Sequence, residues 1–436
     1  MSPLRACLGA GHRGAMALLV APALLTAPVA RAQVSGPNMS GPEMAGRWVA
    51  VGPGVAVLVL SPEAGRANAA PLGSEGLSMQ EPPQPKPPLE QPDGQEAASP
   101  QAELRRQVSR SYAVPKAGRA FSLDTRYGRV QINPWNKSEI RVEAEFVARA
   151  ETEAGARQVL DALGVQWLDY DARTGGVAVS TQFGPALRGR AGGCRYEVNY
   201  TVWLPRTTAL RVYNSFGEVA IAGDLRGPVE LAVEYGALRA GRLEGPRTLI
   251  RVGNGTGTIA FVACASIDAS YARLRLDAGT IVDLRNNYSD IDIGTVQDLT
   301  VHSKYGDVAL GTVRNLRGSS GYSRFTIDKL DEALDMALRH CPDFVVRDMG
   351  PNFRQVNLDG GYSTIRLGFA EAPGFRFDVS TEQGQLLVDK TLVRVLSQEN
   401  GPQTSDVLGV FGALAPSRRA GSVNIKVRYG TVRFSK

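Results

Sequence analysis

Three aspartates in a repeated part of this 436-residue sequence come nearest to a catalytic or metal site. Asp290 and Asp307 occupy equivalent places in consecutive copies of the repeat, and Asp292 follows the first by two positions. Equivalent residues of stacked strands lie about 4.8 Å apart, so unneutralised carboxylates there would hold a Ca²⁺ ion or have a raised pKa. The same spacing places an arginine beside each carboxylate, namely Arg273, Arg275 and Arg324. We therefore expect a self-neutralising surface ladder, with no catalytic residue and no metal site.

A column of aromatic residues is the second candidate site. Its binding candidates are Tyr271, Tyr288, Tyr305 and Tyr322. Rings held in register can stack on one another and stabilise the fold, by about 0.5 to 1.5 kcal/mol per pair, or they can offer their faces to sugar rings. If Val308 and Leu310 point inward, Tyr305 has the opposite parity, and its ring lies outside the core unless the chain bends at Gly306. We expect mainly a structural ladder with covered ring faces, and sugar binding is the alternative.

Other catalytic chemistry has little support in the sequence. Only His302 and His340 follow the N-terminal segment, and both are expected at surface or turn positions. The sequence has no Gly-x-Ser-x-Gly turn, no His-Glu-x-x-His helix and no phosphate loop. This pattern predicts a protein that is not an enzyme and that uses no cofactor.

The repeat that positions these residues consists of an aromatic residue, a small residue and then alternating apolar positions. Copies begin at Tyr127, Phe216, Tyr288, Tyr305, Tyr322, Tyr362 and Tyr429. From Tyr271 to Tyr322 each step is 17 residues, and the period-two alternation inside a copy is typical of short strands. The pattern predicts an all-β solenoid, a single-stranded parallel β-helix with about 17 to 21 residues per coil, running from residue 210 to residue 436. Within it we expect a helix-like stretch from Leu330 to Arg339 and a loop insertion at 397–421.

Residues 108–209 do not follow the repeat. Glu151 to Leu163 has a helical period, with acidic residues in its first turn and Gly164 after its end. Strands are expected on both sides of it, at 121–124, 129–132, 140–147, 177–180 and 196–204. Because the open end of a solenoid offers unpaired backbone groups to other chains, we expect this β-rich segment with its one helix to cap the coils.

The N-terminal part predicts export. Residues 1–32 have basic residues, a short apolar run and the cleavage pattern Ala30-Arg31-Ala32 of a signal peptide. The run is too short for a transmembrane span. A second such stretch, from Arg47 to Ala69, leaves open which segment is used. Either one directs the protein to the periplasm, the outer membrane surface or the extracellular space. Residues 33–107 are rich in proline and polar residues, which predicts a disordered tether.

Net charge bears on which partners are expected, and the cysteine positions bear on disulfide bonds. The formal net charge of +6 is small for the chain length and mixed in sign along the sequence, so nucleic acid is not expected as a partner. Cys194, Cys264 and Cys341 are too far apart for a disulfide framework, and whether any two of them pair stays open.

Residues 126–135, Arg-Tyr-Gly-Arg-Val-Gln-Ile-Asn-Pro-Trp, with Ile140 to Ala144 and the predicted helix, resemble the opening of the bacterial "putative adhesin" domain of unknown function, related to the GIN adhesin-head group. The repeated Tyr-Gly-x-Val units extend the resemblance to residue 434. It implies a right-handed β-helix on an exported protein and supplies no catalytic residues. We therefore expect a non-enzymatic cell-envelope protein, an adhesin or structural interaction protein, whose partner is a cell-surface glycan or an envelope protein. The alternative is a carbohydrate-binding or polysaccharide-cleaving β-helix; the oligomeric state stays open.

Overall fold

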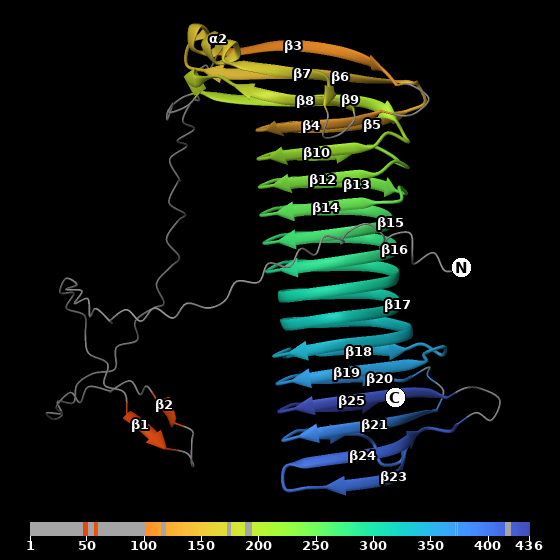
Figure 1. Ribbon diagram of the computed structural model, residues 1–436. Helices are drawn as coiled ribbons and strands as arrows, with labels where there is room; N and C mark the ends of the chain where they lie inside the picture. Colours follow the sequence, from red (N-terminus) through yellow and green to blue (C-terminus); the bar gives the residue numbers. More distant parts are fainter. Residues whose placement is uncertain are drawn as a thin grey trace, which may run out of the picture. The chain divides into compact units, whose positions relative to one another are not determined.

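The computed structural model describes residues 47–50, 56–59, 102–114, 119–171, 176–187, 194–370, 372, 374–414 and 420–436. Two short strands, β1 (Arg47–Ala50) and β2 (Ala56–Val59), pair antiparallel within one unit of the chain, Gly11–Gln95. All other described residues belong to the second unit (Figure 1). The predicted signal peptide and most of the predicted tether lie outside the described residues.

The first part of the second unit, residues 102–205, is called the cap here. Its elements are β3 (Ala102–Ala113), β4 (Ala120–Arg126), β5 (Arg129–Trp135), β6 (Glu139–Ala150), α2 (Glu153–Asp161), β7 (Leu163–Asp171), β8 (Gly176–Phe183), the short 3₁₀ turn η1 (Pro185–Leu187) and β9 (Arg195–Pro205). β3 begins before the expected start at residue 108, and β7 was not expected. The antiparallel pairs β3–β6, β6–β9 and β7–β8 form most of the cap.

The predicted helix is confirmed as α2. The hydroxyl of Thr152 caps it by accepting a hydrogen bond from the Gly155 backbone N–H at 3.1 Å. Its buried face consists of Ala156, Val159 and Leu160, which the helical period had indicated. The helix contacts β3 and β6 and so covers part of one end of the strands (Figure 1).

The remaining residues form stacked layers, each with strands on two sides. The first strands are β10 (Leu210–Ser215), β11 (Glu218–Ile221), β12 (Val229–Glu234), β13 (Ala237–Leu243), β14 (Thr248–Gly253), β15 (Thr256–Ser270), β16 (Arg273–Asn287) and β17 (Asp290–Arg339). The others are β18 (Phe344–Met349), β19 (Gln355–Gly361), β20 (Thr364–Gly368), β21 (Phe375–Glu382), β22 (Gln385–Leu387), β23 (Val393–Asn400), β24 (Thr404–Phe411), β25 (Gly421–Arg428) and β26 (Thr431–Ser435). Together with the cap they make one sheet of 24 strands among the described residues.

Neighbouring layers pair in parallel and in register, except at β24, which pairs antiparallel with β21 and β23. Leu274 lies opposite Ile291 and Leu276 opposite Ile293, and all four side chains are buried. Alternate residues point outward, as the period-two pattern predicts. The expectation of an all-β chain with one helix is confirmed for this part of the molecule. No helix among the described residues is long and apolar enough to cross a membrane.

Two local predictions are wrong. Leu330 to Arg339 is the end of the strand β17 and not a helix, because Ala333 to Arg339 pairs in parallel with β19. The predicted loop at 397–421 contains half of β23 and all of β24, an antiparallel pair. The layers are also not stacked in chain order throughout, since β25 lies between β19 and β21 (Figure 1).

Candidate functional site

One edge of the layers carries a column of residues in the left-handed backbone conformation. The non-glycine residues with positive φ, between 48° and 59°, are Tyr127, Phe216, Tyr235, Asn254, Tyr271, Tyr288, Tyr305, Tyr322, His340, Tyr362, Gln383 and Tyr429. We call this set the αL column. L-residues with side chains rarely adopt this conformation, which costs about 1 to 3 kcal/mol unless the surroundings enforce it. Most of these residues turn the chain between two strands of one layer, for example Phe216 between β10 and β11, whereas Tyr305 and Tyr322 lie within β17.

The rings of the αL column stack on one another outside the core. Adjacent rings have centroids 4.4 to 5.2 Å apart and planes within 16° of parallel. Tyr271, Tyr288, Tyr305 and Tyr322, the four binding candidates, form a continuous run within it. Tyr305 is 36% exposed although both of its faces are covered by neighbouring rings. The expected position of Tyr305 outside the core is therefore confirmed, whereas a binding role for the four tyrosines stays a prediction.

His340 is a member of the column that the sequence pattern missed. Its imidazole is stacked between the rings of Tyr322 at 4.7 Å and Tyr362 at 4.9 Å. A usable signal was present, because His340 follows Tyr322 by about one repeat and is followed by the small residue Cys341. The other histidine, His302, lies on the surface, where its Nδ1 is 3.1 Å from the Ser319 hydroxyl.

Buried polar residues behind the column hold its turns in place. Asn286 donates hydrogen bonds to the Ser303 hydroxyl at 3.0 Å and to the Ser289 carbonyl at 3.2 Å. The Ser289 hydroxyl accepts from the Ala272 backbone N–H at 3.0 Å. Because buried polar groups cost free energy unless they are paired, this network favours the observed turn over other backbone conformations.

The aspartate ladder has the predicted geometry. Asp290 is 3.8 Å from Arg273, Asp292 is 3.8 Å from Arg275, and Asp307 is 3.1 Å from Arg324. The side chains are more than half exposed, so each pair contributes about 0 to 1 kcal/mol. In the described part of the chain no group of His, Cys, Asp and Glu side chains is arranged to hold a metal ion.

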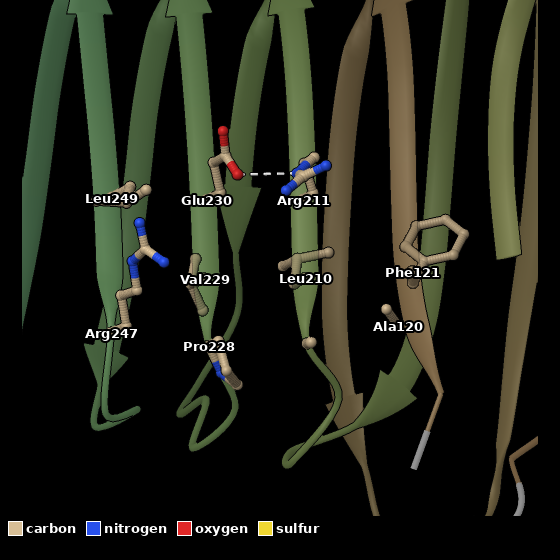
Figure 2. Close-up of a pocket in the computed structure, with 10 residues that line it drawn as sticks. Ala120, Phe121, Leu210, Arg211, Pro228, Val229, Glu230, Arg247 and Leu249 are labelled. Carbon is tan, nitrogen blue, oxygen red and sulfur yellow. Dashed lines mark hydrogen bonds and ion pairs between the residues drawn. The ribbon is translucent and has the colours of Figure 1, made fainter. Parts of the chain in front are cut away.

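A pocket of about 240 Å³ lies where β4, β10, β12 and β14 begin (Figure 2). Arg211 donates a hydrogen bond to Glu230 at 2.8 Å, and the Tyr213 hydroxyl donates another at 2.6 Å. Burial alone would raise the pKa of Glu230, but the hydrogen bond from Tyr213 and the charges of Arg211 and Arg251 outweigh it and hold the pKa below its usual range. The carboxylate is therefore ionised and paired, which does not suit a general acid.

A larger concavity, of about 640 Å³, lies beside the αL column where it passes His340, Tyr362 and Tyr429. Its other lining residues are mostly polar and include two ion pairs. Arg339 is 3.0 Å from Asp359, and Arg428 is 3.1 Å from Glu382. Lys426 and Asp406 also line it. The combination of ring edges with fixed donors and acceptors can bind a polar, hydroxyl-bearing ligand.

The three cysteines named in the sequence analysis are not joined to one another by disulfide bonds. Cys194 and Cys341 are free thiols, so no two of Cys194, Cys264 and Cys341 are joined to each other. Cys341 is fully buried, and its thiol contacts the Ser320 backbone carbonyl and hydroxyl. Burial of that kind favours a packing role for this thiol.

Comparison with known proteins adds little beyond this geometry. No protein-family model matches the sequence, and no curated protein matches it. Among solved structures, a "putative cell adhesion protein" from Clostridium sporogenes is 10% identical with a TM-score of 0.16, and covers 76% of this chain and 99% of its own. "Putative adhesins" from Bacteroides fragilis and Parabacteroides merdae are 12% and 9% identical, with TM-scores of 0.24 and 0.27, each over 76% of this chain and 97% of its own. At these values the likeness assigns no function to this chain.

Proposed function

We propose that this protein is a non-enzymatic, exported protein of the cell envelope that acts as an adhesin or structural interaction protein. The observation that carries the proposal is the lateral surface of the layers, where one arrangement of stacked rings and paired charges recurs from layer to layer. A recurring surface suits contact with an extended partner, such as a glycan chain or an envelope protein. An enzyme instead needs one place where acidic and basic groups of different pKa converge.

The charge pairing also favours binding over catalysis. The carboxylates of Asp290, Asp307 and Glu230 each lie beside an arginine. For Glu230, the hydrogen bond from Tyr213 and the charges of Arg211 and Arg251 hold the pKa below its usual range, so this carboxylate is hindered from donating a proton near neutral pH. Polysaccharide cleavage by a pair of carboxyl groups requires one of them to be protonated.

We also propose that the layers wind as a single-stranded, right-handed parallel β-helix. The support is the register, since parallel neighbours such as Leu274 and Ile291 are separated by one repeat along the chain. Connections between parallel strands of one sheet are right-handed in nearly all proteins. A crystal structure with left-handed connections would contradict this part of the proposal.

The test of function is a binding and turnover assay on the purified full-length protein. We expect retention on isolated bacterial envelopes or on a glycan array, and no release of reducing ends from a panel of polysaccharides. Glu230→Gln and Asp307→Asn serve as controls that remove the two best-placed carboxylates. Cleavage by the wild type that either variant abolishes would overturn the non-enzymatic assignment.

A second candidate, a carbohydrate-binding or carbohydrate-cleaving protein, is favoured by the concavity beside His340, Tyr362 and Tyr429. Ring edges next to ion pairs occur in many sugar sites, where hydroxyl groups bind to fixed donors and acceptors. Asp359→Asn tests this candidate. Loss of glycan binding with unchanged melting would place the site in that concavity.

A further inference from the structure

The αL column is interrupted by a non-aromatic residue between two tyrosines. Asn254 has φ of 49°, like its neighbours, and directly follows Gly253, which pairs with Glu234 in one layer and with Ser270 in the next. These partners directly precede Tyr235 and Tyr271. Asn254 therefore takes the place of a ring in the stack.

The missing ring leaves a slot of suitable width for one inserted ring. Parallel strands are about 4.8 Å apart, so Tyr235 and Tyr271 lie about 9.6 Å apart across two layers, and a ring midway would be about 4.8 Å from each. That value lies within the 4.4 to 5.2 Å seen between neighbouring rings of the column.

The floor of the slot offers polar contacts and open space. The side chain of Asn254 is shorter than that of tyrosine, so it fills less of the space between the two rings. No hydrogen bond joins this amide to the described residues, which leaves its donors and its acceptor available. Gly253 adds no side chain beside it. A Cβ at Gly253 would meet only the Glu234 Cγ at 3.6 Å, an ordinary contact, so packing does not require glycine there.

We propose that this slot binds one pyranose ring of a glycan, held between the faces of Tyr235 and Tyr271 and hydrogen-bonded to the Asn254 amide. The Asn254 amide can both donate and accept hydrogen bonds, which suits the hydroxyl groups of a sugar. The sugar's apolar C–H faces cover the tyrosines while its hydroxyl groups reach the amide. Glu234 and Arg273 lie on neighbouring layers at the flanks and supply further polar contacts. The inference rests on the proposed function and deepens it by naming a ligand class and a site.

Asn254→Tyr is the sharpest test, because it completes the column without removing any contact. We expect it to reduce affinity for the glycans that the wild type binds on an array by at least tenfold, with a melting temperature equal to that of the wild type or higher. Phe216→Tyr is the matched control, since it places the same side chain in the same column where a ring is already present, between Tyr127 and Tyr235. It should bind like the wild type.

Tyr271→Ala removes one wall of the slot and should also weaken glycan binding, whereas Tyr322→Ala should not. Full glycan binding by Asn254→Tyr would overturn the slot while leaving the proposed function intact. If the wild type is retained on envelopes but binds no glycan, the slot is likewise overturned and the proposed function stays intact. Stronger competition by free tryptophan than by monosaccharides would assign the slot to aromatic ligands and contradict the inference. Failure of the wild type to bind envelopes and glycans alike would count against the proposed function as well.

Discussion

The cap and the layers use the same two strand positions, since β4 and β5 pair in parallel with β10 and β11, but they are stabilised differently. In the cap, long antiparallel strands bury single large side chains such as Phe146 and Tyr200. Tyr200 donates to or accepts from the Thr181 hydroxyl at 2.8 Å, and its burial raises its pKa to about 12. In the layers, by contrast, small sets of side chains recur at the same position in layer after layer.

The charged surfaces differ in the same way. In the cap, Glu103 accepts hydrogen bonds from both Arg149 and Arg105 at 2.7 Å, and Arg149 also donates to Glu197. This network crosses several strands. In the layers most pairs join one arginine to one carboxylate in the next layer, as in Arg324 with Asp307. The cap is thus an end structure that does not repeat, and the layers are a repeated structure that Asn254 interrupts at one position of the αL column.

Truncation of a core side chain should cause the largest loss of stability, and its consequences should differ between the cap and the layers. Phe325→Ala in the layers and Phe146→Ala in the cap are each expected to lower the free energy of unfolding by about 3 to 5 kcal/mol, because both side chains are almost fully buried. Urea unfolding measures this loss. Only Phe146→Ala should also cause aggregation below the melting temperature, since a loosened cap exposes strand edges. Equal light scattering from the two variants would contradict the protective role of the cap.

Removal of the Thr152 hydroxyl that caps α2 should lower stability less, and only within residues 102–205. Thr152→Ala is expected to lower the free energy of unfolding by about 1 kcal/mol, because the Gly155 N–H loses its acceptor. Thr152→Ser keeps the hydroxyl and is the matched control. Hydrogen exchange should rise in α2 and β3 and stay unchanged in β16. A uniform rise across the layers would show that cap and layers unfold as one unit.

The pocket in Figure 2 gives a pH test at the junction of the two regions. The folded pKa of Glu230 lies below its usual value of 4.5, so its stabilising effect is present above that value and is lost as the pH falls through the folded pKa. The stability difference between wild type and Glu230→Gln should therefore be largest near neutral pH and shrink below about pH 4.5. Urea unfolding at a series of pH values checks this. A difference that grows toward acid would reverse the assigned direction.

Removal of one carboxylate of the charge ladder should change the free energy of unfolding least. Asp307→Asn is expected to change the free energy of unfolding by less than about 1 kcal/mol, because its pair with Arg324 is exposed. Added Ca²⁺ should leave the melting temperature of the wild type unchanged, since a bound ion would stabilise the fold in proportion to its occupancy. A rise of several degrees that is absent in Asp307→Asn would show a Ca²⁺ site in place of the ladder.

The repeat pattern predicted the strands of the layers and the stacking of the column well, because both depend on local spacing. Positions 334, 336 and 338 are buried in period two, yet the alanines and leucines around them favour a helix in isolation. Pairing with β19 overrides that preference. Composition likewise led to the wrong prediction of a loop at 397–421, because glycine and serine occur there inside the strands β23 and β24. The insertion of β25 between β19 and β21 is a long-range feature that no local pattern encodes.

Recognition of the candidate site was limited in a similar way. The tyrosine period located Tyr271 to Tyr322, but His340 and Asn254 share the column only through their backbone conformation. A search for aromatic residues therefore passes over both. The signal common to all members is a residue followed by a small one at the start of a strand, and this signal is too general to be decisive by itself.

The central claim is that the αL column is a scaffold whose ring faces are covered within each stacked run, and that Asn254 interrupts it between Tyr235 and Tyr271. Tyr288→Ala combined with Tyr305→Ala tests it most directly, with melting temperature and binding to envelopes or glycans measured on the same preparation. The account predicts a lower melting temperature, from three lost stacking contacts of about 0.5 to 1.5 kcal/mol each, and binding close to that of the wild type. Unchanged melting with binding abolished would show that the column is itself the binding surface and would contradict the account.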